Sequence, residues 1–194
     1  MKFYFYCSFY CGYCYVTELR NWLPDSIGSV TWMGLDEPYN TCFVPFYAGA
    51  LDLPTSYQTG NTSNFNKNTA WWAFNFVSNL SALKFSYMKE DIQKIQKHLE
   101  ATSFAKQAQI EAEALRLYKK DPKSACQYLT KYSNENASYV VNKWWKLSTY
   151  LIEKYADGCI NKPHPYREVG YPKSWLHKTE YKNGPTSYKK KPLD

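Results

Sequence analysis

Three cysteines near the start of the sequence have the residue type and spacing that could do chemistry. Cys7, Cys11 and Cys14 follow the pattern C-x3-C-x2-C, and three such thiolates can ligate three irons of a [4Fe–4S] cluster. Residues 3–18 around them are rich in Phe, Tyr, Val and Thr, which favours a strand. In a strand, Cys7 and Cys11 would share one face and Cys14 would point to the other. The pattern is therefore also typical of small thiols buried in an aromatic sheet.

The cysteine spacing resembles the cluster loop of radical S-adenosylmethionine enzymes, which gives an alternative function. Those enzymes need a run of βα units after the loop, whereas this sequence predicts a few strands followed only by helices. Their Gly-Gly-Glu-Pro-like segment is matched only poorly by residues 35–38. Spacing without the supporting fold is a weak signal, so we expect core cysteines and keep the iron–sulfur protein as the alternative.

The remaining cysteines and the histidines predict no metal site. His98, His164 and His177 are scattered and lack the spacing of metal ligands. A chain this long needs no disulfide framework despite its six cysteines. A nucleophile made of a cysteine and a histidine that meet in the fold stays open, but the sequence marks no one cysteine for that role; the other three are Cys42, Cys126 and Cys159.

Composition indicates a folded chain with no affinity for nucleic acid or membrane. Of 194 residues, 44% are hydrophobic and 21% are charged, and aromatic residues reach 19%. The net charge of +7 comes partly from the tail residues 189–191. No groove-reading or base-stacking motif accompanies it, and no apolar run approaches the roughly 20 residues that span a bilayer. The first residues enter a strand-like pattern without a signal peptide, so we expect an internal piece of a longer protein and leave the compartment unassigned.

The first third of the sequence predicts three short antiparallel strands, at about residues 3–18, 28–35 and 41–47. Turns with Pro24 and Pro38 separate them. Pro45 cannot donate to a ladder, so the third strand should lie at a sheet edge or carry a bulge. Three strands make a thin sheet, which suggests that further strands belong to sequence outside this chain.

Residues 70–157 predict helices. One apolar stripe runs from Trp72 to Leu99, and a second helical stretch covers about residues 104–118. A short helix is expected at 123–131 and a longer one at 135–156, with Gly158 as its stop. The inward positions of that longer helix are Val140, Val141, Trp144, Leu147, Leu151 and Tyr155. The fold class is therefore α+β, with residues 1–160 as one domain and 161–194 as an extended tail rich in Lys, Pro and Tyr.

Several blocks, in order over residues 16–176, resemble the dipeptidase A type of cysteine dipeptidase. Residues 20–24 are similar to the family's Arg-x-Trp-Leu-Pro, and residues 28–36 to its Gly-Gly-x-x-Trp-x-Gly-x-Asp strand. Residues 44–49 are similar to its x-Pro-Phe-Tyr-x-Gly segment. Residues 70–79 and the closing Gly-Tyr-Pro-x-x-Trp at 170–175 continue the likeness. Such blocks in register are more specific than one cysteine spacing.

The resemblance implies the C-terminal portion of an N-terminal-nucleophile hydrolase, with an αββα sandwich, that hydrolyses dipeptides without metal or cofactor. In that superfamily the first residue of the mature enzyme supplies the nucleophile, here a thiol, and its own α-amino group acts as the base. The likeness fades before Val16, so Cys7, Cys11 and Cys14 inherit no role and the nucleophile is expected upstream of this chain. No catalytic residue is therefore assigned.

Arg20 is the candidate for substrate binding. It stands at the end of a predicted strand beside a proline turn, where a guanidinium could hold a substrate carboxylate; a surface arginine fits the same position. The implied partners are dipeptides, and the parent enzyme could form a homo-oligomer. A non-catalytic helical interaction module is a further alternative function.

Overall fold

A computed structural model describes residues 11–170 and 173–179 of the chain. It divides into two compact units, Met1–Thr149 and Tyr150–Asp194. The part of the first expected strand that precedes residue 11 lies outside the described residues, and so does Cys7.

The first unit contains a three-stranded antiparallel sheet in the order β1 (Tyr13–Leu19), β2 (Ser29–Leu35) and β3 (Val44–Tyr47). In its register Tyr13 faces Leu35 and Val30 faces Tyr47. The predicted meander is therefore confirmed. β3 pairs only with β2 among the described strands, so Pro45 lies in an edge strand as expected.

Helices cover one face of this sheet. Alternation along β2 turns Val30 and Trp32 to the same side, where they form a buried cluster with Tyr47 of β3 and residues of three helices. The helical members are Ile27 of the short α1 (Asp25–Gly28), Ala114 of α4 (Phe85–Tyr118) and Leu129 of α5 (Pro122–Tyr155). The mixture of an antiparallel sheet and packed helices confirms the α+β class.

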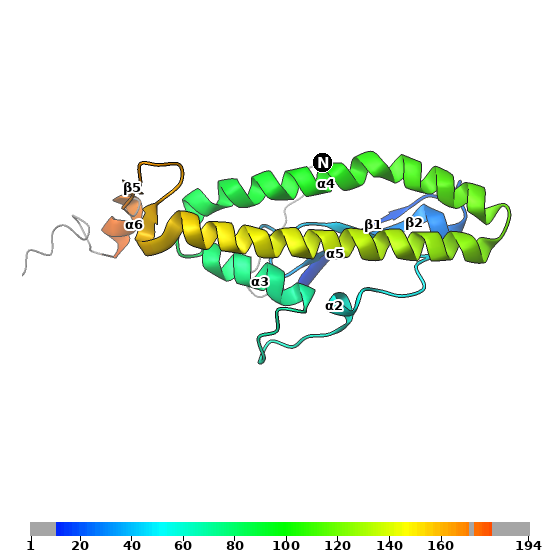
Figure 1. Cartoon of the computed structure of the whole chain (residues 1–194), viewed down its shortest axis with the longest axis horizontal. Helices are drawn as coiled ribbons and strands as arrows, with labels where there is room; N and C mark the ends of the chain where they lie inside the picture. Colours follow the sequence, from blue (N-terminus) through cyan, green and yellow to red (C-terminus); the bar gives the residue numbers. More distant parts are fainter. Residues whose placement is uncertain (1–10, 171–172, 180–194) are drawn as a thin grey trace, which may run out of the picture. The chain divides into compact units, whose positions relative to one another are not determined.

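α4 and the part of α5 in the first unit run side by side along the sheet (Figure 1). The amide of Asn136 in α5 donates to the hydroxyl of Ser103 in α4 at 3.3 Å. Asp121 ends the turn between the helices, where its carboxylate accepts the backbone N–H groups of Lys123 and Ser124. This capping, followed by Pro122 at the first helical position, explains why the second helix begins there.

The helix boundaries differ from the prediction in three places. The stripe from Trp72 to Leu99 is divided between α3 (Ala70–Ser81) and α4, and Leu83 in the break is 67% exposed instead of inward. The breaks expected near residues 100 and 132 do not occur, because α4 and α5 are each 34 residues long. The hydroxyl of Thr102 donates to the carbonyl of His98 at 2.7 Å, so this polar residue is accommodated within a continuous helix.

The segment between β3 and α3 is held by aromatic contacts. It contains the short α2 (Thr55–Gln58), which the sequence did not predict. The indole of Trp72 donates to the carbonyls of Asn61 and Asn64 at 3.0 and 2.8 Å. The Phe65 ring lies 6.1 Å from that of Trp145 in α5. Trp72 therefore fixes the loop to α3, in agreement with a packing role.

The second unit begins inside α5. All six inward positions predicted for this helix are buried. Gly158 has φ 74 and closes the short 3-10 turn η1 (Ala156–Gly158), which confirms it as a stop. β4 (Cys159–Ile160) then pairs with β5 (Arg167–Glu168), and α6 (Lys173–Lys178) follows. The stretch expected to be extended therefore contains short regular elements. Among the described residues no helix is long and apolar enough to cross a bilayer.

Candidate functional site

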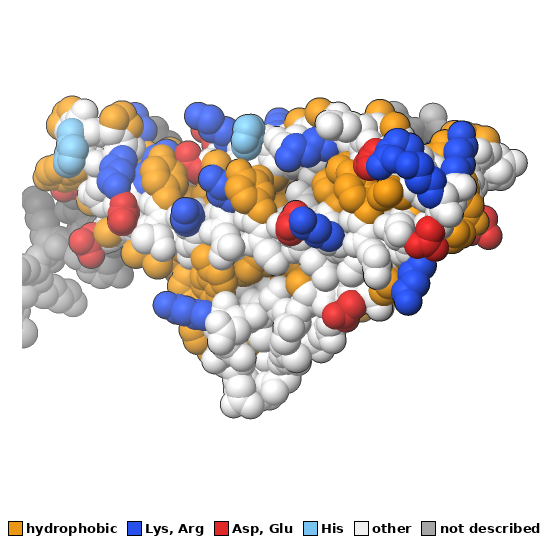
Figure 2. All heavy atoms as spheres, turned by 45° about the vertical axis from the view of Figure 1, so that its right-hand side comes forward, with side chains coloured by type: hydrophobic (Ala, Val, Ile, Leu, Met, Phe, Trp, Pro, Cys, Tyr) orange, Lys and Arg blue, Asp and Glu red, His pale blue; other side chains and the backbone are white. Residues whose placement is uncertain are grey.

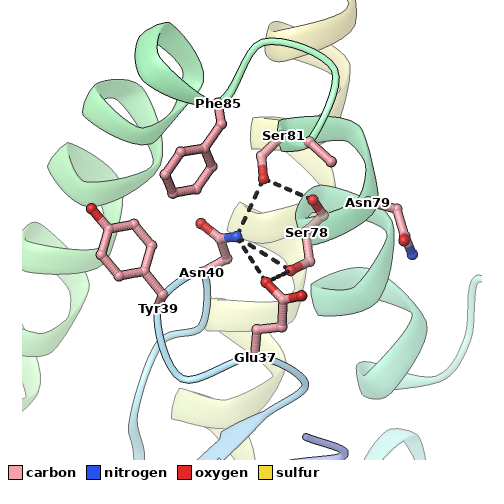
Figure 3. A pocket seen from close by; sticks show the side chains of 8 residues that line it. Glu37, Tyr39, Asn40, Ser78, Asn79, Ser81 and Phe85 are labelled. Atoms are coloured by element: carbon pink, nitrogen blue, oxygen red, sulfur yellow. Dashed lines mark hydrogen bonds between the residues drawn. The ribbon is translucent and has the colours of Figure 1, made fainter. Parts of the chain in front are cut away.

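A cavity of about 600 Å³ opens where the turn after β2 meets the end of α3 and the beginning of α4. Figure 3 shows its wall, to which the turn contributes a carboxylate, a phenol and an amide, and the helices two hydroxyls and a phenyl ring. The lining residues are Glu37, Tyr39, Asn40, Ser78, Asn79, Ser81, Ala82 and Phe85. Because it is concave and combines apolar rings with convergent polar groups, this cavity is the candidate site.

The turn that carries Glu37 and Asn40 is fixed by Asp36. Its φ of 65 lies in the left-handed region, which Asp tolerates better than most residues and which reverses the chain directly after β2. The Asp36 carboxylate accepts the side-chain amide of Asn75 in α3 at 2.9 Å. The N–H of Asn40 donates to the carbonyl of Glu37 at 3.1 Å and closes the turn. The turn is thus tied both to itself and to α3.

Asn40 is the centre of the polar wall. Its amide nitrogen lies 3.3 Å from Glu37 Oε2, 3.3 Å from Ser78 Oγ and 3.2 Å from Ser81 Oγ. Ser78 in turn donates its hydroxyl to Glu37 Oε2 at 2.9 Å, and Ser81 donates to the carbonyl of Ser78 at 2.7 Å. The network, drawn in Figure 3, holds one carboxylate oxygen of Glu37 in place.

Two aromatic rings form the opposite wall. The rings of Tyr39 and Phe85 lie 5.4 Å apart, and both side chains are partly exposed. The hydroxyl of Tyr39 accepts the side-chain amide of Gln93 in α4 at 3.0 Å, which anchors this ring. The cavity thus has a hydrogen-bonded polar wall that carries one carboxylate, and an aromatic wall opposite it.

Arg20 does not belong to this cavity. It lies beside Gly28 at the beginning of β2, whereas Glu37 follows the end of this strand; seven residues separate the two ends, roughly 20 Å at about 3.3 Å per residue. Its guanidinium donates to Glu111 of α4 at 2.7 Å, and the side chains of Arg20 and Glu111 are 11% and 12% exposed. Arg20 is therefore a largely buried ion-pair partner in this structure, and substrate binding by it stays a prediction.

The cysteines that the structure describes offer no marked nucleophile. Cys42 is buried, and burial, together with the Glu100 carboxylate, raises the pKa of its thiol well above the ordinary value. A thiol in that environment is not a thiolate at neutral pH. Cys11, Cys126 and Cys159 are partly exposed. Within residues 11–170 and 173–179 no three of His, Cys, Asp and Glu gather as metal ligands; the iron–sulfur alternative involves Cys7, which lies outside.

Glu100 gives a pH-dependent prediction. Burial raises the pKa of Glu100 above its ordinary value of 4.5, although N–H groups of Phe43 and Gln96 donate to it. Between the unfolded and the folded pKa the native chain binds more protons, so its stability falls as the pH rises through this window. Glu100→Gln should therefore be more stable than the wild type near pH 7, with the difference closing near pH 4, in urea unfolding at both pH values. An equal or larger advantage at the lower pH would contradict this.

Lysine and arginine side chains do not gather into one patch on the face shown in Figure 2. They lie among acidic and apolar side chains. This distribution resembles a solvated basic surface, and the predicted absence of nucleic-acid binding stays a prediction.

The region that contains the sheet and the cavity is similar to known peptidases. Residues 11–98 match the model of peptidase family C69, which confirms the resemblance to the dipeptidase family. The chain is also similar to probable dipeptidase B of Streptococcus pyogenes serotype M1, with 22% identity over 140 residues. Those residues are 72% of this chain but only 28% of that relative.

Sequence reasoning missed the cavity residues. The sequence predicts a turn at residues 36–40, and it shows an apolar stripe and a family likeness within residues 70–81, but none of these indicates a cavity. One signal was present: Ser78 and Ser81 are three residues apart and lie on the buried face of α3, and polar residues on an apolar face need a hydrogen-bonding partner.

Proposed function

We propose that this chain is part of a cysteine dipeptidase and that the nucleophilic cysteine belongs to sequence outside these 194 residues. The observation that carries the proposal is the match of residues 11–98 to peptidase family C69. The relative's length supports the second half of it: 140 residues are 28% of that protein, which therefore has roughly 500. The matched residues thus span little more than a quarter of that relative.

The reaction would be attack of a thiolate on the scissile carbonyl of a dipeptide. An α-amino group, with a pKa of about 8, would accept the thiol proton, and backbone or amide donors would stabilise the oxyanion. Among the described cysteines, the burial of Cys42 argues against a nucleophilic role. The described residues would contribute the sheet, the helices over it and the cavity at the end of β2.

An αββα sandwich, with this chain as its C-terminal portion, would explain why large side chains are exposed on the outer face of the sheet. Tyr13, Tyr15 and Leu19 of β1 alternate onto the face opposite Trp32 and are 60%, 61% and 73% exposed. Large apolar side chains on an open sheet face are typical of a surface that packs on another element. We propose that a second sheet from the remaining polypeptide is the occupant, since the relative has far more sequence than this chain covers.

For Arg20 to bind a substrate carboxylate, that carboxylate would have to replace Glu111 as its ion-pair partner. In the described arrangement its guanidinium is engaged by Glu111, so its role in a substrate complex would need that ion pair to open. The ion pair favours a positioning role, in which Arg20 holds α4 against the end of β1.

The native polypeptide tests the proposal directly. An antibody raised against the 194-residue chain is used to capture its antigen from the cells that make it, and the size and dipeptidase activity of the captured protein are measured. We expect a polypeptide of roughly 500 residues whose hydrolysis of dipeptides is abolished by thiol alkylation. A captured chain of 194 residues without activity would instead support the non-catalytic module. Iron in the captured protein would support the iron–sulfur alternative.

A further inference from the structure

The cavity at the end of β2 holds a buried acceptor that has no partner. Asn40 is 3% exposed, and its Oδ1 makes no hydrogen bond in the described structure. Figure 3 shows this oxygen directed between the rings of Tyr39 and Phe85. A buried acceptor without a donor is costly and is uncommon in native proteins unless a ligand or water satisfies it.

The hydrogen bonds around Asn40 fix which end of its amide faces the cavity. The hydroxyl protons of Ser78 and Ser81 are both donated elsewhere, to Glu37 Oε2 and to the carbonyl of Ser78. All three neighbours of the amide nitrogen therefore present lone pairs to it, together with a carboxylate charge. Reversing the amide would place its oxygen against three acceptors, so the nitrogen must lie there and the oxygen must face the aromatic rings.

Glu37 adds a negative charge to the same wall of the cavity, on the amide-nitrogen side of Asn40. The hydrogen bonds that the structure gives to its carboxylate all reach Oε2, which leaves Oε1 for a ligand. Two acceptors, one of them charged, require a ligand with several donors and a positive charge. An ammonium group has three N–H donors and no acceptor, and a charge-assisted hydrogen bond to a carboxylate is stronger than a neutral one.

The aromatic cover suits the same ligand. Cations bind to the faces of Tyr and Phe, and the ring of Phe85 lies across Asn40 Oδ1 without a polar group to anchor it. We infer that the Phe85 side chain must turn aside to admit the ligand, while Tyr39 is retained by Gln93.

We propose that this cavity binds a protonated primary amine through Glu37, Asn40 and the two rings. Resting on the proposed function, the amine is the free α-ammonium group of a dipeptide. Other ligand classes fit less well. A substrate carboxylate would be repelled by Glu37, and no residue that lines the cavity in the described structure is basic. A hard metal ion prefers six or more oxygen ligands and gains nothing from aromatic rings.

Calorimetric titration of the purified chain tests the proposal with three probes: propylamine, alanyl-alanine and N-acetyl-alanyl-alanine. The first two should bind and the acetylated dipeptide should not, because acetylation removes the charge. Binding of alanyl-alanine should also weaken as the pH rises past about 8, where an α-ammonium group loses its proton. Glu37→Gln should weaken binding of both amines about tenfold or more.

Glu113→Gln is the matched control, because it removes a carboxylate from an exposed part of α4. It should leave both affinities unchanged. Circular dichroism shows whether each variant is folded. If Glu37→Gln does not fold, the difference in binding between free and acetylated dipeptide, measured on the wild-type chain, still tests the proposal.

Any of three results would overturn the proposal. The acetylated dipeptide could bind as tightly as the free one, folded Glu37→Gln could keep the wild-type affinity, or neither amine could bind. Binding of propylamine but not of alanyl-alanine would retain the amine site and overturn the peptide as its ligand. The titration needs no nucleophile, so its failure is distinct from failure of the dipeptidase proposal, which is judged on the captured native polypeptide.

Discussion

Replacing Glu111 with alanine is expected to lower the free energy of unfolding by up to about 3–5 kcal/mol, the cost of removing one member of a buried ion pair; the more exposed Glu18, 3.6 Å from the Arg20 guanidinium, remains as its acidic partner. Glu111 accepts the guanidinium of Arg20 at 2.7 Å and the hydroxyl of Tyr47 at 3.2 Å. Arg20 cannot neutralise itself by losing a proton when Glu111 is removed, because a guanidinium stays protonated in proteins.

The effect should be large because Arg20 also organises the turn between β1 and β2. It donates to the carbonyls of Gly28 and Ile27, at 3.3 and 3.4 Å. A Cβ at Gly28 would lie 2.5 Å from the carbonyl oxygen of Arg20, so only glycine allows this approach. Loss of Glu111 would therefore disturb the sheet as well as the attachment of α4.

Urea unfolding of the purified chain measures the change. Glu113→Ala is the matched control, two positions along the same helix, where the carboxylate pairs with Arg116 at the surface. Its unfolding midpoint should not move, since exposed ion pairs contribute little. A midpoint for Glu111→Ala as high as that of the control would show that the Arg20–Glu111 pair does not hold the two elements together.

The second large effect is expected from Phe74→Ala in α3. Phe74 is fully buried, and its ring lies 5.1 Å from that of Trp144 in α5, which is also fully buried. Removing the ring loses its transfer free energy and leaves a cavity between two helices, which costs about 3–5 kcal/mol.

Phe85→Ala provides the comparison for this loss. Phe85 has the same side chain but is 42% exposed and contacts the ring of Tyr39. Its removal should cost no more than about 1.5 kcal/mol, the contribution of an exposed aromatic pair. Thermal unfolding of both variants tests the difference. Equal losses would mean that the contact between α3 and α5 is not part of the core.

The sequence was most informative where one physical rule dominates. Alternation predicted the three antiparallel strands, Pro45 predicted an edge strand, and apolar periodicity predicted six of the buried positions of α5. It failed at the division between α3 and α4. No proline or glycine marks that division, so the local sequence does not signal the non-helical φ of −151 at Lys84.

The candidate site was harder to predict than the fold, because its residues meet only in three dimensions. Glu37 and Asn40 come from a turn, and Ser78 and Ser81 from a helix some 40 positions later; the separations are 38 and 41 residues for Asn40. Arg20 illustrates the converse. Its position at a strand end favoured a site-facing charge, but the partner that defines its environment, Glu111, is 91 residues away.

The measurement that tests the central claim most directly is hydrolysis of a dipeptide panel by the purified 194-residue chain, with and without a thiol alkylator. We predict no hydrolysis in either case, because we propose that the nucleophilic cysteine belongs to sequence outside these 194 residues. Hydrolysis that alkylation abolishes would contradict the claim, since one of the six cysteines present would then be the nucleophile.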